Sequence, residues 1–503
     1  MTDPAPFLID DADLPALRNA IVNIAGAGYC EAGIRQRLGL SDIIDLHWHA
    51  LPVYRMKQST VRDELTSAID LFLMQGAISS DELNRLFEKG VQDALLRAGV
   101  LTIDDTGVVR ARASLFPVGD CLIFSDHAWP KLPHPGYTRI PYNQVMAVGS
   151  DSHWLARTTV RRPVGSTLDL CTGSGVHAIL AASHSRRVLA VDINPRAANC
   201  TQFNIKASGA TNVEIVVGDL YEHLHGERFD LITANPPFVP SPVNSLGFRD
   251  GGRSGEDVQR RIVAGLPIHL APGGIAQIVT ELGESDEVSV SDRLRTWLNG
   301  APLDIHILRL RVHSITDYSV AHADGEFDYG VFMDSVHDWA DNLRTQGYSR
   351  IVSVLLTFQW NDPAFGAPWI RSVDTQPPRA EAGTELETML RTERLARDPG
   401  LYEMIVNGRV SRAGLIRLME IQTLGSNLNK NTHAELLGQS LPVILKLNPV
   451  EREILVLLNE PMGLPDLIMR AGGLNLSTEK IFATVGSLLW RGLFLLNDCR
   501  VSV

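Results

Sequence analysis

Residues 167–180 read Thr-Leu-Asp-Leu-Cys-Thr-Gly-Ser-Gly-Val-His-Ala-Ile-Leu, an apolar run that leads into a glycine-rich turn and then into a helical pattern. Gly173 and Gly175 allow the backbone to turn sharply and to approach a ligand closely. The third glycine of a dinucleotide fingerprint is missing, so no pyrophosphate cradle is predicted. By itself the pattern is a weak signal, because many such turns only connect a strand to a helix.

Apolar runs and helical patterns alternate from about residue 148 to residue 360. The apolar runs lie at 167–170, 188–191, 213–217, 229–233, 275–280, 305–312 and 351–359. Helical stretches such as 258–270, 291–298 and 335–345 separate most of them. This alternation predicts an α/β fold, with a Rossmann-like, seven-stranded, doubly wound sheet that is mostly parallel.

Three acidic residues stand at the ends of the first three predicted strands. They are Asp169, Asp192 and Asp219. Each one alone is ordinary for a solvated turn or a helix cap. Together they fall on the carboxyl edge of the sheet, where open α/β sheets bind their ligands. There Asp192 can accept both hydroxyls of a ribose, Asp219 can accept an exocyclic amine, and Asp169 can face a cationic group.

The fourth predicted strand runs into Ile232-Thr-Ala-Asn-Pro-Pro-Phe238. Two consecutive prolines remove two backbone donors and fix φ, so the segment is stiff. The Asn235 side chain and the Pro236 carbonyl remain as acceptors, with Phe238 as an apolar plate beside them. This arrangement favours binding of a planar NH2 group for methyl transfer. The alternative is a rigid turn that only closes the strand.

These motifs together resemble the class I S-adenosylmethionine-dependent methyltransferases, over about residues 145–360. The resemblance implies that Asp192 holds the ribose, Asp219 and Leu220 the adenine, and that Gly173 and Gly175 make room for the methionine part. It also assigns Asp169, Cys171, Ile193, Asn194 and Asn235 to the cofactor site, and Asn235, Pro236, Pro237 and Phe238 to catalysis. Residues 149–152 correspond to a segment that closes over the cofactor in relatives.

The segment after the motif bears on the methyl acceptor. Residues 239–255, with Gly251, Gly252 and Gly255, resemble the protein-glutamine N5-methyltransferases that act on translation release factors, although their aromatic is usually Tyr where this chain has Phe238. We therefore expect a protein glutamine amide, in a factor of translation, as the acceptor. An adenine-N6 or guanine-N2 amino group of RNA or DNA is the alternative. A non-catalytic protein that only binds the cofactor is a second alternative.

Composition narrows the class of protein. The chain has 503 residues and a formal net charge of −12, which argues against tight, non-specific binding of nucleic acid. Its five cysteines show no pairing pattern, its start lacks a signal-peptide pattern and no apolar run reaches spanning length. We expect a cytoplasmic protein without a membrane contact. His47 and His49 lack partners at zinc spacing, so no metal is expected.

The flanks predict accessory domains that are mainly helical and winged-helix-like. In the first, helical patterns at 61–74, 79–88 and 91–98 precede two short strands at 100–103 and 108–111. Residues 361–383 are rich in Pro and Gly and predict a linker. Beyond it the chain is expected to be helical to its end. The predicted domains are 1–145, 146–362 (the methyltransferase domain) and 384–503.

Overall fold

The computed structural model describes residues 7–47, 50–58, 61–127, 142–243, 245–324, 328–423 and 429–497. His49 therefore lies outside the described residues. The chain divides into two compact units. The first comprises Met1–Ala156, Arg162–Ala301 and Val312–Thr357, and the second comprises Arg157–Arg161, Pro302–Arg311 and Phe358–Val503.

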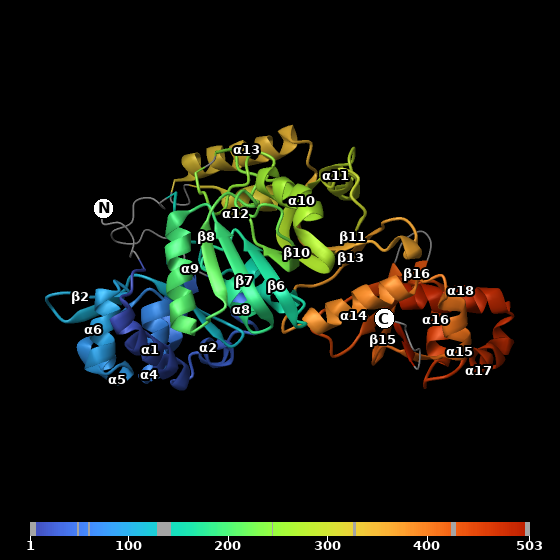
Figure 1. Ribbon diagram of the computed structural model, residues 1–503, viewed down its shortest axis with the longest axis horizontal. Helices are drawn as coiled ribbons and strands as arrows, with labels where there is room; N and C mark the ends of the chain where they lie inside the picture. Colours follow the sequence, from blue (N-terminus) through green and yellow to red (C-terminus); the bar gives the residue numbers. More distant parts are fainter. Residues whose placement is uncertain are drawn as a thin grey trace. The chain divides into compact units, whose positions relative to one another are not determined.

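A central α/β sheet carries the segment that decides the fold (Figure 1). Its elements in chain order are α7 (Ser150–Thr158), β6 (Val164–Leu170), α8 (Val176–Ala182), β7 (Ser185–Asp192), α9 (Pro195–Ser208), β8 (Val213–Val217), β9 (Phe229–Ala234), α10 (Asp257–His269), β10 (Leu270–Glu284), α11 (Val290–Trp297), β11 (Leu303–Ser314), α12 (Ile315–His322), α13 (Tyr329–Thr345), β12 (Arg350–Trp360) and β13 (Ile370–Asp374).

The strand order of this sheet is β13-β11-β12-β10-β9-β6-β7-β8. From β6 the chain proceeds through β7 to β8 on one side, and then returns to place β9 and β10 on the other side of β6. Each of these neighbouring pairs is parallel. The reversal puts a topological switch point between β6 and β9, at the carboxyl edge where α/β sheets of this kind bind ligands. The predicted Rossmann-like fold is confirmed.

The sheet has one strand more than the sequence predicts. β13 pairs in parallel with β11, from Ile305 opposite Ile370 to Arg309 opposite Asp374. It lies inside the stretch predicted as a linker. Prolines on both sides of it make the whole stretch look like a loop, and its five residues are too few to show a periodicity.

The N-terminal part of the first unit consists of short helices and hairpins. They are α1 (Leu14–Gly26), α2 (Glu31–Leu38), α3 (Leu51–Gln58), α4 (Glu64–Ala68), β1 (Ala77–Ser79), α5 (Ser80–Leu86), α6 (Lys89–Arg97), β2 (Leu101–Ile103), β3 (Val108–Ala111), β4 (Ser114–Val118) and β5 (Cys121–Ser125). Ser79 and Glu82 form the expected capping box of α5. Strands β1, β3 and β2 form a small antiparallel sheet. A separate winged-helix-like domain stays a prediction.

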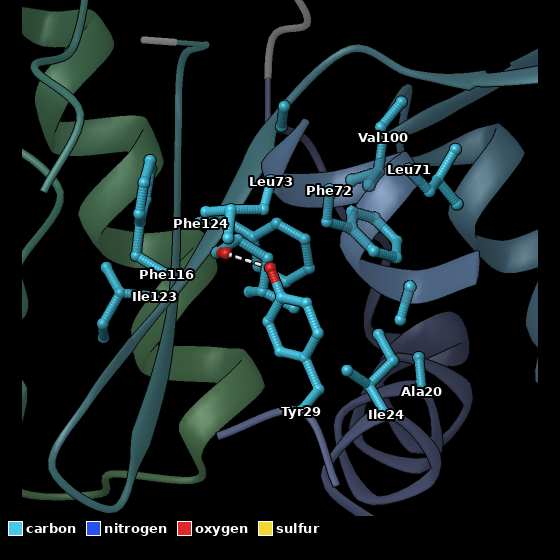
Figure 2. Packing of buried hydrophobic residues seen from close by; sticks show 14 of the residues in the cluster. Ala20, Ile24, Tyr29, Leu71, Phe72, Leu73, Val100, Phe116, Ile123 and Phe124 are labelled. Atoms are coloured by element: carbon cyan, nitrogen blue, oxygen red, sulfur yellow. Dashed lines mark hydrogen bonds between the residues drawn. The ribbon is translucent and has the colours of Figure 1, made fainter. Parts of the chain in front are cut away.

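One hydrophobic core joins these N-terminal elements to helix α9 of the methyltransferase part. The ring of Phe124, on β5, packs edge-on against Phe203 of α9, with 5.4 Å between the ring centroids. Phe124 also meets Phe72 edge-on at 6.3 Å. Figure 2 shows Phe72 and Phe124 beside Tyr29, whose buried hydroxyl donates a 2.6 Å hydrogen bond to the Leu115 carbonyl of β4.

The second unit contains strands where the sequence predicts helix. Its C-terminal elements are α14 (Gly383–Leu395), α15 (Leu401–Asn407), β14 (Arg409–Arg412), β15 (Ile416–Thr423), β16 (Asn429–Leu436), β17 (Ile444–Leu447), α16 (Pro449–Leu457), α17 (Leu464–Arg470), α18 (Thr478–Trp490) and β18 (Phe494–Asn497). The prediction of a helical chain to the end is therefore wrong for β14–β17. Strand β16 is mostly polar, and β15 and β16 pair antiparallel along the whole hairpin.

The Tyr29 hydroxyl provides a test of the shared core. We expect Tyr29→Phe to lower the free energy of unfolding by about 1 kcal/mol, because a buried carbonyl loses its donor. Chemical denaturation measures the change, with Tyr329→Phe as the matched control, since Tyr329 is 80% exposed. Equal stability of both variants would show that the hydroxyl contributes nothing to this core.

Candidate active site

The glycine turn and the Asn-Pro-Pro-Phe segment meet at the switch point of the sheet. Asp169 pairs with Thr233, and Leu170 with Ala234, in the register of β6 and β9. Both segments leave their strands directly after the last of these pairs. Two motifs that are about sixty residues apart in the sequence are thus neighbours in space.

The glycine turn adopts a conformation that needs glycine. Gly173 has φ +59° and Gly175 has φ +82°, both in the left-handed region. A Cβ atom on Gly175 would also lie 2.8 Å from the Cγ2 atom of Thr201. The Thr201 hydroxyl donates a 2.9 Å hydrogen bond to the Gly173 carbonyl, so α9 holds the turn in place.

Asp192, at the end of β7, is bound to the same turn. One of its carboxylate oxygens accepts the Gly173 N–H at 2.8 Å, and the other accepts the Asn194 N–H at 2.9 Å. A carboxylate oxygen has two acceptor positions, so each oxygen retains one for a further donor. Burial raises the pKa of Asp192, and these two hydrogen bonds oppose that shift. The arrangement suits a pair of ribose hydroxyls.

Asp169 is fully buried and joins the two halves of the site. Its oxygens accept hydrogen bonds from the hydroxyl groups of Thr172 at 2.6 Å and of Thr233 at 2.8 Å. Burial raises the pKa of this carboxyl to about 7. The contact with the cationic end of the cofactor stays a prediction, while the contacts in the structure give Asp169 a clear role in holding the turn.

The three predicted acids all act electrostatically on the Cys171 side chain. The charges of Asp192, Asp169 and Asp219 all raise the pKa of this thiol, after burial, which is the largest cause. Asp219 lies 2.9 Å from Arg261, to which it is ion-paired. The neighbouring Leu220 is buried. The structure thus brings together acids that lie far apart in the sequence.

These residues fit S-adenosylmethionine. The turn carries no side chain at Gly173 and Gly175, and at Gly175 it passes close to Thr201 of α9. Asp192 has acceptor positions to spare for the ribose. Next to it Ile193 is 67% exposed and Val217 is 48% exposed, so two apolar side chains are available to a flat adenine ring. Asn194 caps α9 and also donates to the Asn143 carbonyl at 2.9 Å.

The orientation of the Asn235 side chain is fixed by helix α7. Its Nδ2 group donates hydrogen bonds to Oδ2 of Asp151 and to Oγ of Ser152, both at 3.1 Å. The amide oxygen Oδ1 is shielded from solvent and has no hydrogen-bond donor among the described residues. An unmet buried acceptor is unfavourable by about 1–3 kcal/mol, which a bound N–H group would relieve.

The glycines after the motif support its backbone. Gly251 donates its N–H to the Val239 carbonyl at 2.9 Å, and Val239 donates to the Arg249 carbonyl at 2.9 Å. A Cβ atom on Gly251 would lie 2.8 Å from the Pro237 carbonyl oxygen and 2.9 Å from Cα of Phe238. The loop therefore fits only without side chains, and it fixes the path of the Pro-Pro-Phe segment.

Phe238 packs on a cluster of aromatic and aliphatic side chains, most of which come from residues 315–351 of the first unit. This cluster contains Val239, Tyr318, Trp339, Leu343, Tyr348 and Ile351, with Phe238 and Ile315 beside it. Phe238 itself is half-buried. The aromatic plate expected from the sequence therefore has a rigid support, while part of its surface stays accessible.

Sequence reasoning missed two functional candidates at this edge. The sequence places Asp151 only in the segment 149–152 that is expected to close over the cofactor. In the structure Asp151 instead accepts a hydrogen bond from the Asn235 side chain. Glu281 was not considered, although an acid near the end of a predicted strand follows the same rule that identified Asp192. Tyr318 and Ser353, which bind Glu281, gave no signal, because only the fold brings them there.

Among the described residues, no three His, Cys, Asp or Glu side chains are grouped as ligands for a metal ion. Among the same residues, no helix combines the length and the apolar character needed to span a bilayer.

We expect Asp169 to make cofactor binding sensitive to pH. A cationic group beside it requires the ionised carboxylate, and with a pKa of about 7 that form is lost in acid. We expect the affinity for S-adenosylmethionine to fall by up to about tenfold per pH unit below this pKa. Isothermal titration calorimetry at about pH 6 and about pH 8 measures it, and Asp169→Asn should remove the dependence. The same slope in that variant would assign it to another group.

Comparisons with known proteins agree with the geometry. The model of the methyltransferase small domain matches residues 147–296. A putative protein N5-glutamine methyltransferase of Methanocaldococcus jannaschii is 30% identical over 155 residues, which cover 29% of this chain and 78% of that protein. A release factor glutamine methyltransferase of Xylella fastidiosa is 36% identical over 222 residues, 41% of this chain and 69% of that protein.

A third relative is covered less completely. The ribosomal protein uL3 glutamine methyltransferase of Bradyrhizobium diazoefficiens is 40% identical over 139 residues, which are 25% of this chain and 43% of that protein. This chain thus spans less than half the length of that relative. With the fold, the glycine turn and these relatives established, the methyl donor is S-adenosylmethionine, and the chain belongs to the glutamine methyltransferase family built on the methyltransferase small domain.

Proposed function

We propose that this protein transfers the methyl group of S-adenosylmethionine to the side-chain amide nitrogen of a glutamine in a protein of translation. The observation that carries the proposal is the Asn235 side chain, which is held by Asp151 so that its amide oxygen lacks a partner. A primary amide is a ligand that matches this acceptor, since its NH2 group offers two N–H donors.

The chemistry requires an oriented nitrogen lone pair. S-adenosylmethionine supplies an electrophilic methyl group when it is bound. An amide nitrogen is a weak nucleophile, because its lone pair is delocalised into the carbonyl. Acceptors that bind its N–H groups, such as Oδ1 of Asn235 and the Pro236 carbonyl, orient the nitrogen and favour the pyramidal form that reacts. Asn235, Pro236, Pro237 and Phe238 are the residues we assign to this step.

The residues beside Asn235 suit a flat, neutral group. The accessible face of Phe238 can stack on the plane of an amide, and the glycine loop with Gly251 and Gly255 keeps the Pro-Pro-Phe backbone in place. Names of the relatives support a protein acceptor, either a release factor or ribosomal protein uL3. Because such a substrate is found in the cytoplasm, we propose a cytoplasmic location. We also propose that residues 1–145 and 384–503 form accessory domains that flank the methyltransferase domain.

The orientation of Asn235 can be tested by an isosteric change. In Asp151→Asn the new amide can donate to Asn235, so the Asn235 side chain can rotate and present N–H towards the acceptor. We expect kcat to fall about 100-fold, as for the loss of one oriented polar contact, with cofactor affinity within about twofold of the parent. Asp338→Asn, an exposed change on α13, is the control. Full activity of Asp151→Asn would refute the proposed orientation.

The class of acceptor is tested by labelling. The protein is incubated with radiolabelled S-adenosylmethionine and cell extract, and portions are treated with protease or nuclease. We expect protease to remove the label from the macromolecular fraction, and acid hydrolysis to release it as methylamine, the product of an N-methyl amide. Asn235→Ala should give no label. Label that survives protease but is lost to nuclease would identify a nucleic-acid base as the acceptor.

A further inference from the structure

Glu281 lies on the same edge and the same face of the sheet as Asn235. In the register of β9 and β10, Ala234 is opposite Ile278, so continuation of the strands places Asn235 opposite Val279. Residues two apart on a strand share a face, and Glu281 is therefore the next side chain on that face. Strands about 4.8 Å apart that rise about 3.3 Å per residue separate these two backbone positions by about 8 Å. A small group can lie between the two side chains.

The Glu281 carboxylate is held by two hydroxyl groups. The Tyr318 hydroxyl donates to Oε2 at 2.6 Å, and the Ser353 hydroxyl donates to Oε1 at 3.1 Å. Tyr318 belongs to the cluster on which Phe238 packs, so a residue that supports Phe238 also binds Glu281 directly. Glu281 is only half-buried, which leaves part of the side chain accessible.

Asp151 of helix α7 also acts on Glu281. The pKa of the Glu281 carboxyl is raised to about 7, because burial, with a smaller contribution from the charge of Asp151, raises it more than the hydrogen bonds from Tyr318 and Ser353 lower it. Asp151 is the residue that binds Asn235. Glu281 is thus bracketed between a partner of Asn235 and the support of Phe238, beside the position where the acceptor amide would bind.

A chain of polar atoms leads from Glu281 to the half-buried His313. Oγ of Ser353, which contacts Oε1 of Glu281, lies 3.5 Å from Nε2 of His313. A serine hydroxyl can accept a proton from one neighbour and donate its own to the next. Imidazole exchanges protons with water near neutral pH.

We infer that Glu281 is a catalytic residue that takes the proton released by the acceptor nitrogen, and that Ser353 and His313 pass this proton to solvent. The inference rests on the proposed methyl transfer to an amide. It adds a role for three side chains that neither the motif nor the relatives assign.

The step balances as a substitution at nitrogen. The lone pair of the amide nitrogen forms the new N–C bond, and the electrons of the broken C–S bond remain on sulfur. One N–H proton leaves to Glu281 as the N–C bond forms, so the nitrogen never carries the full positive charge. The carboxyl then transfers a proton to Oγ of Ser353, while the serine proton moves to His313. No oxidant or further reactant is needed.

The charged and titratable groups that act on Glu281 or on its partner Tyr318 come from several elements. They are Asp151 on α7, Arg249 and Asp250 in the loop before α10, His313 on β11, and Tyr318 and His322 on α12.

The decisive variant is Glu281→Gln, which keeps the shape but cannot take a proton. Its amide oxygen can still accept from one of the two hydroxyls, Tyr318 or Ser353, while its NH2 group can donate to the other. With purified release factor or ribosomal protein uL3 as acceptor and saturating cofactor, we expect kcat to fall about 100-fold to 10,000-fold. The parent should gain activity as pH rises through about 7, because the base must be ionised. This acid limb should disappear in Glu281→Gln, and cofactor affinity should stay within about twofold.

A second variant separates proton transfer from a structural role. Tyr318→Phe removes a hydrogen bond that lowers the pKa of Glu281, so the acid limb should move to higher pH without disappearing. Ser353→Ala should lower kcat and also move the limb upwards. Glu281→Asp, which restores a carboxylate, should recover part of the activity lost in Glu281→Gln.

Infrared difference spectra provide a readout without turnover. Asp169 and Glu281 both titrate near pH 7, so we expect the protonated-carboxyl signal lost by the parent between about pH 6 and about pH 8 to contain two contributions, and the contribution of Glu281 to be missing from Glu281→Gln. Unchanged kcat and an unchanged pH profile in Glu281→Gln, with Asn235→Ala inactive, would overturn this inference alone. Failure of the parent to label either acceptor or any protein of the extract would overturn the proposed function, and the inference with it.

Discussion

Asp169 accepts one hydrogen bond from Thr172 in the glycine turn and one from Thr233 in strand β9. These two bonds cross the topological switch of the sheet. They fix the turn that is suited to the methyl donor relative to the strand that ends in Asn-Pro-Pro-Phe. Displacement in line needs donor and acceptor atoms to be aligned within a fraction of an ångström. A rigid sheet with a shared buried carboxyl supplies this alignment before any ligand arrives.

The part of the site proposed to bind the methyl acceptor is built from separate elements. Each of them restricts the position of one part of the Asn-Pro-Pro-Phe segment. Helix α7 sets the rotation of the Asn235 amide. The glycine loop sets the path of the Pro-Pro-Phe backbone, since any side chain at Gly251 would overlap it. The aromatic cluster around Tyr318 supports Phe238 from behind. The motif is therefore short in sequence, but its geometry depends on residues up to about 350.

The sequence predicts the cofactor side of the site better than the acceptor side. Asp169, Gly173, Gly175 and Asp192 lie within one β-α-β segment, where local spacing and turn chemistry specify the structure. Asp151, Tyr318 and Ser353 lie on α7, α12 and β12, far in the sequence from Asn235, and no local pattern shows that they meet Asn235 or Glu281. The same limit explains the missed strands, since β13 is short and flanked by prolines, and β15 and β16 pair with each other along a hairpin that no local pattern indicates.

Asn204 of helix α9 couples the N-terminal part to the cofactor turn. Its Nδ2 group donates to the carbonyls of Phe124 at 2.7 Å and Ser174 at 2.9 Å, and its Oδ1 atom accepts the Phe124 N–H at 2.9 Å. One buried amide thus serves an N-terminal hairpin and the glycine turn together. The methyltransferase fold in this chain is consequently not an interchangeable module. A shortened protein that begins after the hairpin would uncover Phe203 of α9 and leave Asn204, which bonds to the cofactor turn, without its partner Phe124.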